Sequence, residues 1–172
     1  FLSDLERLKN TPVEVLLTVN TPEEIPFSVG DVNYPLTMIR NSNTKGFGAN
    51  HNAAFRKAQG RYFCIANPDI RLRQNPFPRL LQALDDPKTA VTAPTILNEI
   101  GQYEDNVRHF PTPASILAKS VGRWPILEYP QNAHPFPVEW AAGMFLLFKS
   151  RLFAEVGGFD ENYHLYYEDV DI

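Results

Sequence analysis

Residues 62–69 read Tyr62-Phe63-Cys64-Ile65-Ala66-Asn67-Pro68-Asp69. The first five are almost continuously apolar, which is typical of a strand that is buried on both faces of a sheet. Proline cannot donate to a strand ladder and keeps the residue before it out of the helical region, so the chain must leave the sheet after Ala66. Asp69 is therefore expected just beyond the carboxyl end of a buried strand, where open α/β sheets bind their ligands.

The segments around this strand alternate between helical and extended patterns. We expect helices at Leu2–Leu8, Ala49–Gln59, Pro78–Leu84, Ala114–Val121 and after Ser150. We expect strands at Val13–Val19, Pro35–Ile39, Thr89–Ile96 and Val138–Phe148. This order predicts an α/β domain with one mixed, mostly parallel sheet flanked by helices.

Residues 1–172 are expected to form a single domain, because no linker or internal repeat divides them. The sequence starts at Phe1 without a methionine and stops at Ile172 inside an acidic run, so we expect a domain that is incomplete at both ends.

Composition narrows the class of protein. Hydrophobic residues make up 44% of 172, which favours one folded domain over a disordered chain. The net charge of -4 argues against a general nucleic-acid binder, which would need a basic face. The single cysteine, Cys64, excludes an internal disulfide, and no apolar run reaches the ~18 residues of a membrane span.

Asp69 is the first candidate site residue. A single carboxylate at the edge of a sheet suits a hard divalent cation, Mg²⁺ or Mn²⁺, that it shares with substrate phosphates. The alternative is that Asp69 caps the turn that follows the strand.

A second candidate is the acidic run Glu168-Asp169-Val170-Asp171, which follows Tyr166 and Tyr167. Three carboxylates within four residues repel each other unless a helix N-terminus, a metal or solvent offsets them. One of them could hold a raised pKa and act as a general base. The alternative is a solvated acidic helix start.

A third candidate is the loop Asn43-Thr44-Lys45-Gly46-Phe47-Gly48, which precedes a predicted helix. Its glycines permit close backbone approach, and a helix N-terminus can meet a phosphate. The loop has neither the Walker A pattern nor the G-x-G-x-x-G spacing, so an ordinary loop is the alternative. The four histidines are scattered and no G-x-S-x-G elbow is present, which disfavours zinc and serine-nucleophile sites.

Taken in order, these segments resemble the family 2 glycosyltransferases, which have a GT-A fold, and most closely their rhamnosyltransferase-like branch. The resemblance covers roughly residues 41–172. It rests on Asn43-x-x-Gly46-Phe47-Gly48 with Asn52, on Gly60-Arg61-Tyr62 through Asn67-Pro68-Asp69, on Trp140-x-x-Gly143, and on Gly157-Gly158-Phe159-Asp160-Glu161 followed by residues 166–171.

The resemblance implies an inverting transfer of a sugar from a nucleoside diphosphate to a glycan or lipid-linked acceptor in polysaccharide biosynthesis. Asp69 would bind a Mg²⁺ or Mn²⁺ ion that bridges the diphosphate. Asp169 would be the base, and Glu168 or Asp171 would orient it. Donor contacts would come from Asn20, Asn43, Gly46, Asn52 and Asn67, while Trp140 and Gly143 would lie on the acceptor side. The implied location is the cytoplasm or the inner face of the membrane.

The sequence departs from the family pattern at two positions that bear on the donor. Asn67 stands where an Asp-x-Asp motif has its first aspartate, which removes one negative charge. Val19-Asn20-Thr21-Pro22 stands where the family usually has an Asp-Asn-x-Ser-like turn, so an aspartate that helps to hold the nucleotide is missing. A nucleotide-sugar or glycan binding module without turnover is therefore an alternative. A sugar-phosphate nucleotidyltransferase is another, although it would need a glycine-rich phosphate loop.

Overall fold

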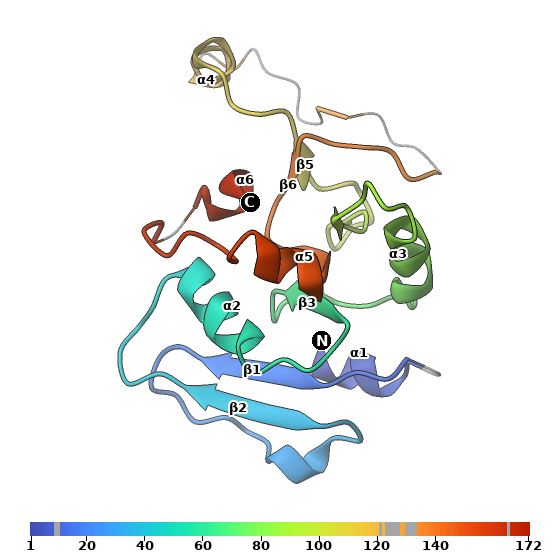
Figure 1. Ribbon diagram of the computed structural model, residues 1–172, viewed down its shortest axis with the longest axis vertical. Helices are drawn as coiled ribbons and strands as arrows, with labels where there is room; N and C mark the ends of the chain where they lie inside the picture. Colours follow the sequence, from blue (N-terminus) through green and yellow to red (C-terminus); the bar gives the residue numbers. More distant parts are fainter. Residues whose placement is uncertain (9–10, 121, 123–127, 130–133, 165) are drawn as a thin grey trace.

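The computed structural model covers residues 1–172 and describes all of them except 9–10, 121, 123–127, 130–133 and 165 (Figure 1). The helices are α1 Leu2–Glu6, the 3₁₀ helix η1 Val29–Asp31, α2 Phe47–Phe55, α3 Phe77–Leu84, α4 Pro113–Ser120, α5 Ser150–Glu155 and α6 Glu168–Asp171. The strands are β1 Val15–Val19, β2 Leu36–Arg40, β3 Tyr62–Ala66, β4 Val91–Thr92, β5 Val107–Arg108, β6 Trp140–Ala141 and β7 Phe145–Lys149. This order confirms the expected mixed α/β class.

The pairing of the strands differs from the expected mostly parallel sheet. Within the described chain, the strands form three small sheets, and only β1 and β2 pair in parallel. Strand β7 lies between β3 and β4 and is antiparallel to both. A further antiparallel pair joins β5 to β6. The connection explains this difference. The chain leaves β4 at the carboxyl edge shared by β3 and β4, and β7 starts at that same edge, so β7 runs in the opposite direction.

The two longest predicted strands are much shorter in the structure. Only Val91–Thr92 of the Thr89–Ile96 segment pairs as a strand. The Val138–Phe148 segment is interrupted at Gly143 and Met144, which form a turn between β6 and β7. A glycine in this apolar run marks the break, because a close neighbour leaves no room for a side chain there.

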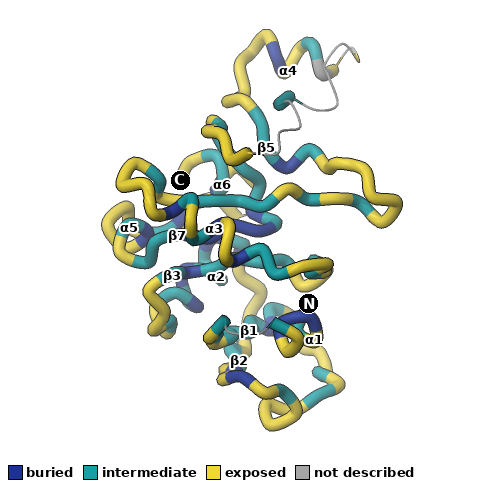
Figure 2. Tube along the Cα trace, turned by 90° about the vertical axis from the view of Figure 1, so that its right-hand side faces the viewer, coloured by how far each residue is buried: buried dark blue, intermediate teal, exposed yellow. Residues whose placement is uncertain are grey.

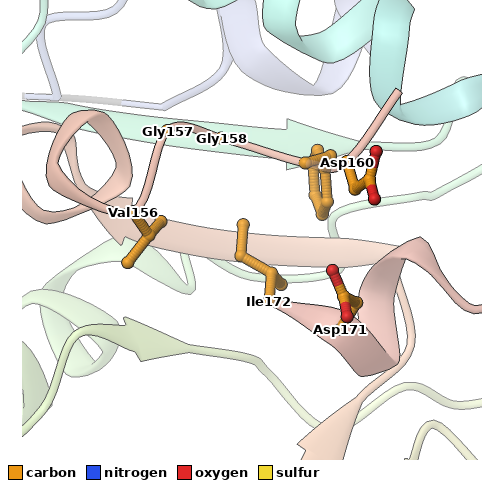
Figure 3. Close-up of a pocket in the computed structure, with 7 residues that line it drawn as sticks. Val156, Gly157, Gly158, Asp160, Asp171 and Ile172 are labelled. Carbon is orange, nitrogen blue, oxygen red and sulfur yellow. The ribbon is translucent and has the colours of Figure 1, made fainter. Parts of the chain in front are cut away.

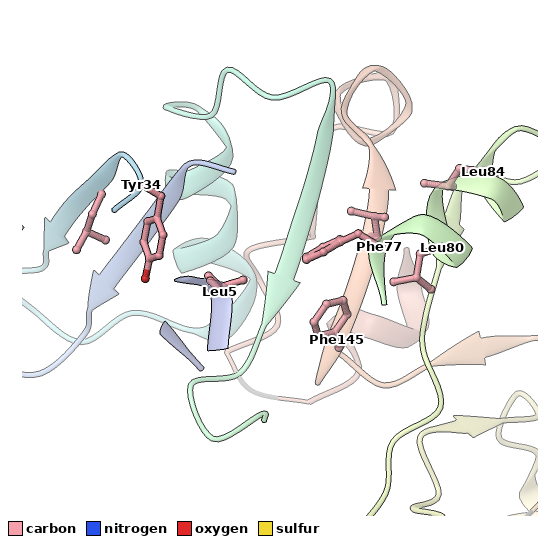
Figure 4. Close-up of a cluster of buried hydrophobic side chains, with 8 residues drawn as sticks. Leu5, Tyr34, Phe77, Leu80, Leu84 and Phe145 are labelled. Atoms are coloured by element: carbon pink, nitrogen blue, oxygen red, sulfur yellow. The ribbon is translucent and has the colours of Figure 1, made fainter. Parts of the chain in front are cut away.

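Strand β7 organises the core by sending alternate residues to opposite faces, as the period of a strand requires. Phe145 and Leu147 pack into a cluster with residues of α1, β2 and α3 (Figure 4). Leu146 and Phe148 pack into a second cluster with residues of α2, β3 and α5. The sheet is therefore covered on both faces, which explains why its strands are continuously apolar.

Helix α4 lies away from this core (Figure 1). Helix α4 lies at the opposite end of the long axis from β2 (Figure 1), and most of its described residues are exposed (Figure 2). The helix predicted at Ala114–Val121 corresponds to α4, although Val121 lies outside the described residues. In the part of the chain that the structure describes, no helix is long and apolar enough to span a bilayer.

Candidate active site

The turn that carries Asp69 is tied to the start of β7. Ala66 pairs with Phe145 at the end of the ladder, and the backbone N–H of Asn67 donates to the carbonyl of Met144 at 3.0 Å. The N–H of Ile70 donates to the carbonyl of Asn67 at 3.2 Å, which closes the turn. Asp69 therefore lies just past the carboxyl end of a buried strand, as the sequence predicts.

Asp169 is tied to the same segment from the other side. The backbone N–H of Gly143 donates to Oδ2 of Asp169 at 3.0 Å. Gly143 and Met144 are consecutive, so two adjacent backbone groups join the Asp69 turn to the helix that carries Asp169. A Cβ on Gly143 would lie 2.7 Å from the ring of Phe47, so no larger residue fits without a shift. Asp69 and Asp169, which are 100 positions apart in the sequence, thus reach one edge of the sheet.

The carboxylate of Asp69 is exposed and accepts no hydrogen bond or ion pair from the residues that the structure describes. The turn is closed by backbone groups, so the geometry gives no support to the capping alternative. Among the described residues, no three His, Cys, Asp or Glu side chains are grouped so that they could hold a metal ion. A single free carboxylate still fits Mg²⁺ or Mn²⁺, because these ions keep several waters and take further oxygens from substrate phosphates.

The three carboxylates of the acidic run have three different environments. Glu168 is buried, with 4% of its surface exposed. Asp169 is half-buried and held by Gly143. Asp171 is exposed and lines a cavity of about 290 Å³ together with Asp160, the Val156–Gly158 turn and Ile172 (Figure 3). The uniformly solvated helix start that we considered as the alternative is therefore wrong for Glu168.

Burial raises the pKa of Glu168; a hydrogen bond from its own backbone N–H offsets part of this, and the nearby Asp169 carboxylate adds to it. Its Oε2 atom is buried without a hydrogen-bond partner in the described part of the chain. An unpaired buried oxygen of this kind destabilises a fold, and such groups are typical of functional sites.

We predict that Glu168→Gln raises the free energy of unfolding at pH 7 by about 1 kcal/mol. A raised pKa means that the folded state holds the proton longer than the unfolded state, whose value is near 4.5. The stability that Glu168 contributes is therefore present below pH 4.5 and is lost as the pH rises through its folded pKa. Urea unfolding at pH 4 and pH 7 should show a gain for the variant at the higher pH only.

His51 also makes the stability depend on pH, but it does so equally in the wild type and in Glu168→Gln. Burial lowers its pKa to about 4, so it destabilises the fold as the pH falls below about 6.5, in the wild type and the variant alike. A Glu168→Gln variant that is less stable than the wild type at pH 7 would contradict the prediction, because it would mean that Glu168 is ionised and paired.

Asn20, on the expected donor side, is used by the protein itself. Its Oδ1 accepts hydrogen bonds at 2.9 Å from the backbone N–H of Lys45 and from the Nδ2 of Asn41, and its Nδ2 donates to the Lys45 carbonyl at 3.0 Å. Asn20 therefore joins the end of β1 to the loop that contains Asn43, whose side chain is exposed. Direct donor contacts from Asn20 and Asn43 stay predictions.

Gly46 and Asn52 connect α2 to the chain that leads into the acidic run. A Cβ on Gly46 would collide with the carbonyl of His164, and that carbonyl accepts the N–H of Phe47 at 3.2 Å. Asn52 is buried; it donates to the carbonyl of Phe159 at 2.8 Å and accepts the N–H of Phe159 at 3.0 Å. The geometry therefore gives both residues a positioning role, and their direct contact with a donor stays a prediction.

The side chain of Asn67 has no hydrogen-bond partner among the described residues, so it is free to contact a donor.

Trp140 lies beside the Asp169 helix, because α6 contacts β6. Its indole N–H donates to the carbonyl of His109 at 2.9 Å, and the guanidinium of Arg108 lies 5.5 Å from its ring centroid. The ring is half-buried, so both a structural role and an acceptor contact remain compatible with its position.

Asp4 is a residue near the site that the sequence analysis missed. Its side chain is 1% exposed and accepts two hydrogen bonds from Arg71, at 2.8 and 3.0 Å, and one from the N–H of Leu72 at 3.0 Å. The hydrogen bond from Arg71 lowers the pKa of Asp4 well below its usual range, against the opposing effect of burial. Asp4 thus holds the chain immediately after Asp69 against α1. No signal in the sequence distinguishes it from the solvated charges of an amphipathic helix.

Comparison with known proteins identifies the family of this chain. The family described as "Glycosyl transferase family 2" matches residues 20–149, which is more than half of the chain. The chain belongs to glycosyl transferase family 2. The match includes the Asp69 turn and Gly143, while the acidic run lies beyond its end.

Individual relatives of this family 2 chain are named as sugar transferases. It is 25% identical over 138 residues to "Rhamnosyltransferase WbbL" of Escherichia coli (strain K12), which covers 74% of the chain and 52% of that protein. It is 27% identical to "N-acetylglucosaminyl-diphospho-decaprenol L-rhamnosyltransferase" of Mycobacterium tuberculosis (strain CDC 1551 / Oshkosh), across 100% of the chain and 63% of that protein. It is 28% identical over 108 residues to "Low-salt glycan biosynthesis hexosyltransferase Agl10" of Haloferax volcanii, covering 62% of the chain and 34% of that protein. The chain therefore spans less than two thirds of the length of each of these relatives.

Proposed function

We propose that this family 2 chain carries the catalytic centre of an inverting glycosyltransferase, which moves a sugar from a nucleoside diphosphate to a hydroxyl of a glycan or lipid-linked acceptor. The observation that carries the proposal is the pair of hydrogen bonds at Gly143 and Met144, which join the Asp69 turn to Asp169. A carboxylate for the diphosphate and a base for the acceptor need this kind of proximity at one edge of a sheet.

The two carboxylates have different roles in the proposed reaction. The acceptor oxygen attacks the anomeric carbon while the bond from that carbon to the diphosphate oxygen breaks, and the nucleoside diphosphate leaves with the bonding electrons. Asp169 takes the proton of the attacking hydroxyl; Gly143 holds its Oδ2, which leaves Oδ1 for the acceptor. Attack on the face opposite the leaving group inverts the anomeric carbon.

Asp69 is the residue that would hold a Mg²⁺ or Mn²⁺ ion, because its carboxylate is exposed and has no partner in the described chain. Such an ion, when bound, offsets the negative charge that develops on the diphosphate. Glu168 is buried and directly precedes Asp169 in the sequence, and we propose that it orients the base. Asp171 is the other candidate for this role.

The names of the relatives guide the choice of substrates. Two of those above are named as rhamnosyltransferases, and one of these names contains a diphospho-decaprenol, which is a lipid-linked acceptor. We propose rhamnose as the first sugar to test, carried on uridine, thymidine or guanosine diphosphate. A lipid-linked acceptor would place the reaction on the cytoplasmic face of the inner membrane, with the chain associated peripherally.

A binding module without turnover is the second candidate, and the Asn20 network favours it. The aspartate that the family usually has near this position is absent, and both polar atoms of the Asn20 amide already bind Lys45 or Asn41. A weakened nucleotide site would leave binding without efficient transfer.

Mass spectrometry of acceptor mixtures incubated with the full chain, donor and Mn²⁺ tests the proposal. We expect a mass increase of one sugar on the acceptor, and no increase without the donor. Donor binding with neither transfer nor donor hydrolysis would favour the binding module. Binding of neither the donor nor a glycan would remove both candidates.

A further inference from the structure

Two consecutive tyrosines immediately before the acidic run adopt an unfavourable backbone conformation. Tyr166 has φ 70° and Tyr167 has φ 72°, which is the left-handed region that side chains other than glycine rarely adopt. At Gly157 and Gly158, a few residues earlier, the chain has positive φ angles of 87° and 77° and uses glycine for them. Retaining tyrosine at 166 and 167 therefore costs free energy that glycine would avoid, and such strain is typical of functional sites.

The packing of the protein does not account for these rings. Tyr166 is 71% exposed and Tyr167 is 58% exposed. Neither ring stacks on another aromatic ring, and neither hydroxyl has a hydrogen-bond partner, among the residues that the structure describes. The backbone of Tyr167 does serve the fold, because its carbonyl accepts the N–H groups of Val170 and Asp171 at the start of α6. The two side chains make no comparable hydrogen bond or ring contact with the described residues.

Tyr166 and Tyr167 lie close to the proposed base in the sequence. Asp169 follows Tyr167 by two residues and is fixed by Gly143, so the tyrosine backbone is held at the same edge of the sheet. A tyrosine offers a flat apolar face and a polar hydroxyl, which together match the C–H face and the hydroxyls of a sugar ring.

Given the proposed function, on which this inference rests, we propose that Tyr166 and Tyr167 form a platform that binds the acceptor sugar beside Asp169. The platform selects a carbohydrate ring as acceptor and leaves the donor diphosphate to the Asp69 side of the site. The energetic cost of the two left-handed residues is then offset when the sugar binds.

Glycine substitutions separate this role from a structural one. Tyr166→Gly and Tyr167→Gly keep the positive φ angles and remove only the rings, so we expect unfolding midpoints that are equal to or higher than that of the wild type. The acceptor KM should rise about tenfold for each lost ring, with an unchanged donor KM. Tyr→Phe at either position should retain most of the acceptor affinity, because the stacking face remains.

The acceptor probe is N-acetylglucosaminyl diphosphate esterified to a short alkyl chain, and its binding to the full chain is also followed by saturation-transfer NMR. Tyr103→Ala, which removes a 47% exposed tyrosine from another loop, is the matched control and should change neither KM. An unchanged acceptor KM in both glycine variants, or an equal rise in donor KM, would overturn the platform. If the wild type binds the probe without transferring sugar, the proposed function fails, while the NMR comparison of wild type and glycine variants still decides the platform. If the wild type does not bind the probe, the platform is overturned.

Discussion

Asp169→Asn is expected to lower sugar transfer by about 10²- to 10⁴-fold while donor binding stays within the error of the wild-type measurement. The amide cannot take the proton of the acceptor hydroxyl at neutral pH. Its oxygen can still accept the hydrogen bond from the Gly143 N–H, so the helix that carries residue 169 should stay in place. Transfer rates at saturating donor and calorimetric titration with the nucleoside diphosphate measure the two effects separately.

Asp85→Asn is a suitable control for this variant, because Asp85 is an exposed carboxylate at the end of α3 and loses the same charge. It should transfer sugar at the wild-type rate. Normal turnover in Asp169→Asn would remove Asp169 as the base and move attention to Glu168, whose raised pKa is the other feature of a general base in the run.

The part of the site that could be predicted from the sequence depends on local signals. An apolar run followed by Asn67-Pro68 fixes where β3 ends, because proline excludes both the ladder and the helix. This places Asp69 at the edge of the sheet without knowledge of any other strand. The acidic run was found in the same way, from the spacing of its carboxylates.

The parts that could not be predicted depend on contacts between distant residues. Asn52 binds Phe159, which is 107 positions further along the chain, and no local pattern marks that partnership. The antiparallel insertion of β7 between β3 and β4 is likewise a property of the whole path of the chain. Gly143 was assigned to the acceptor side by resemblance, whereas its hydrogen bond to Asp169 emerges only when the two segments are folded together.

Asp69→Ala is expected to remove the cation-dependent part of donor binding, so that the affinity in Mn²⁺ falls to the value measured in a chelator, a loss of about tenfold or more. The reason is geometric: Asp69 is the free carboxylate on the turn at the end of β3, and no group of three ligating side chains in the described residues could replace it.

The fold should tolerate this change, because the Asn67 and Ile70 backbone groups close the turn and the Asp69 side chain makes no hydrogen bond or ion pair with the described residues. An unfolding midpoint close to that of the wild type would therefore show that any lost affinity comes from the missing carboxylate. Asp85→Ala serves as the control for charge, and it should leave the response to Mn²⁺ intact. Equal donor affinity with and without Mn²⁺ in the wild type, or an unaltered Mn²⁺ response in Asp69→Ala, would assign the diphosphate to other groups. Asn43, whose side chain is exposed, and Asn67, whose amide has no partner among the described residues, would then be the next residues to replace.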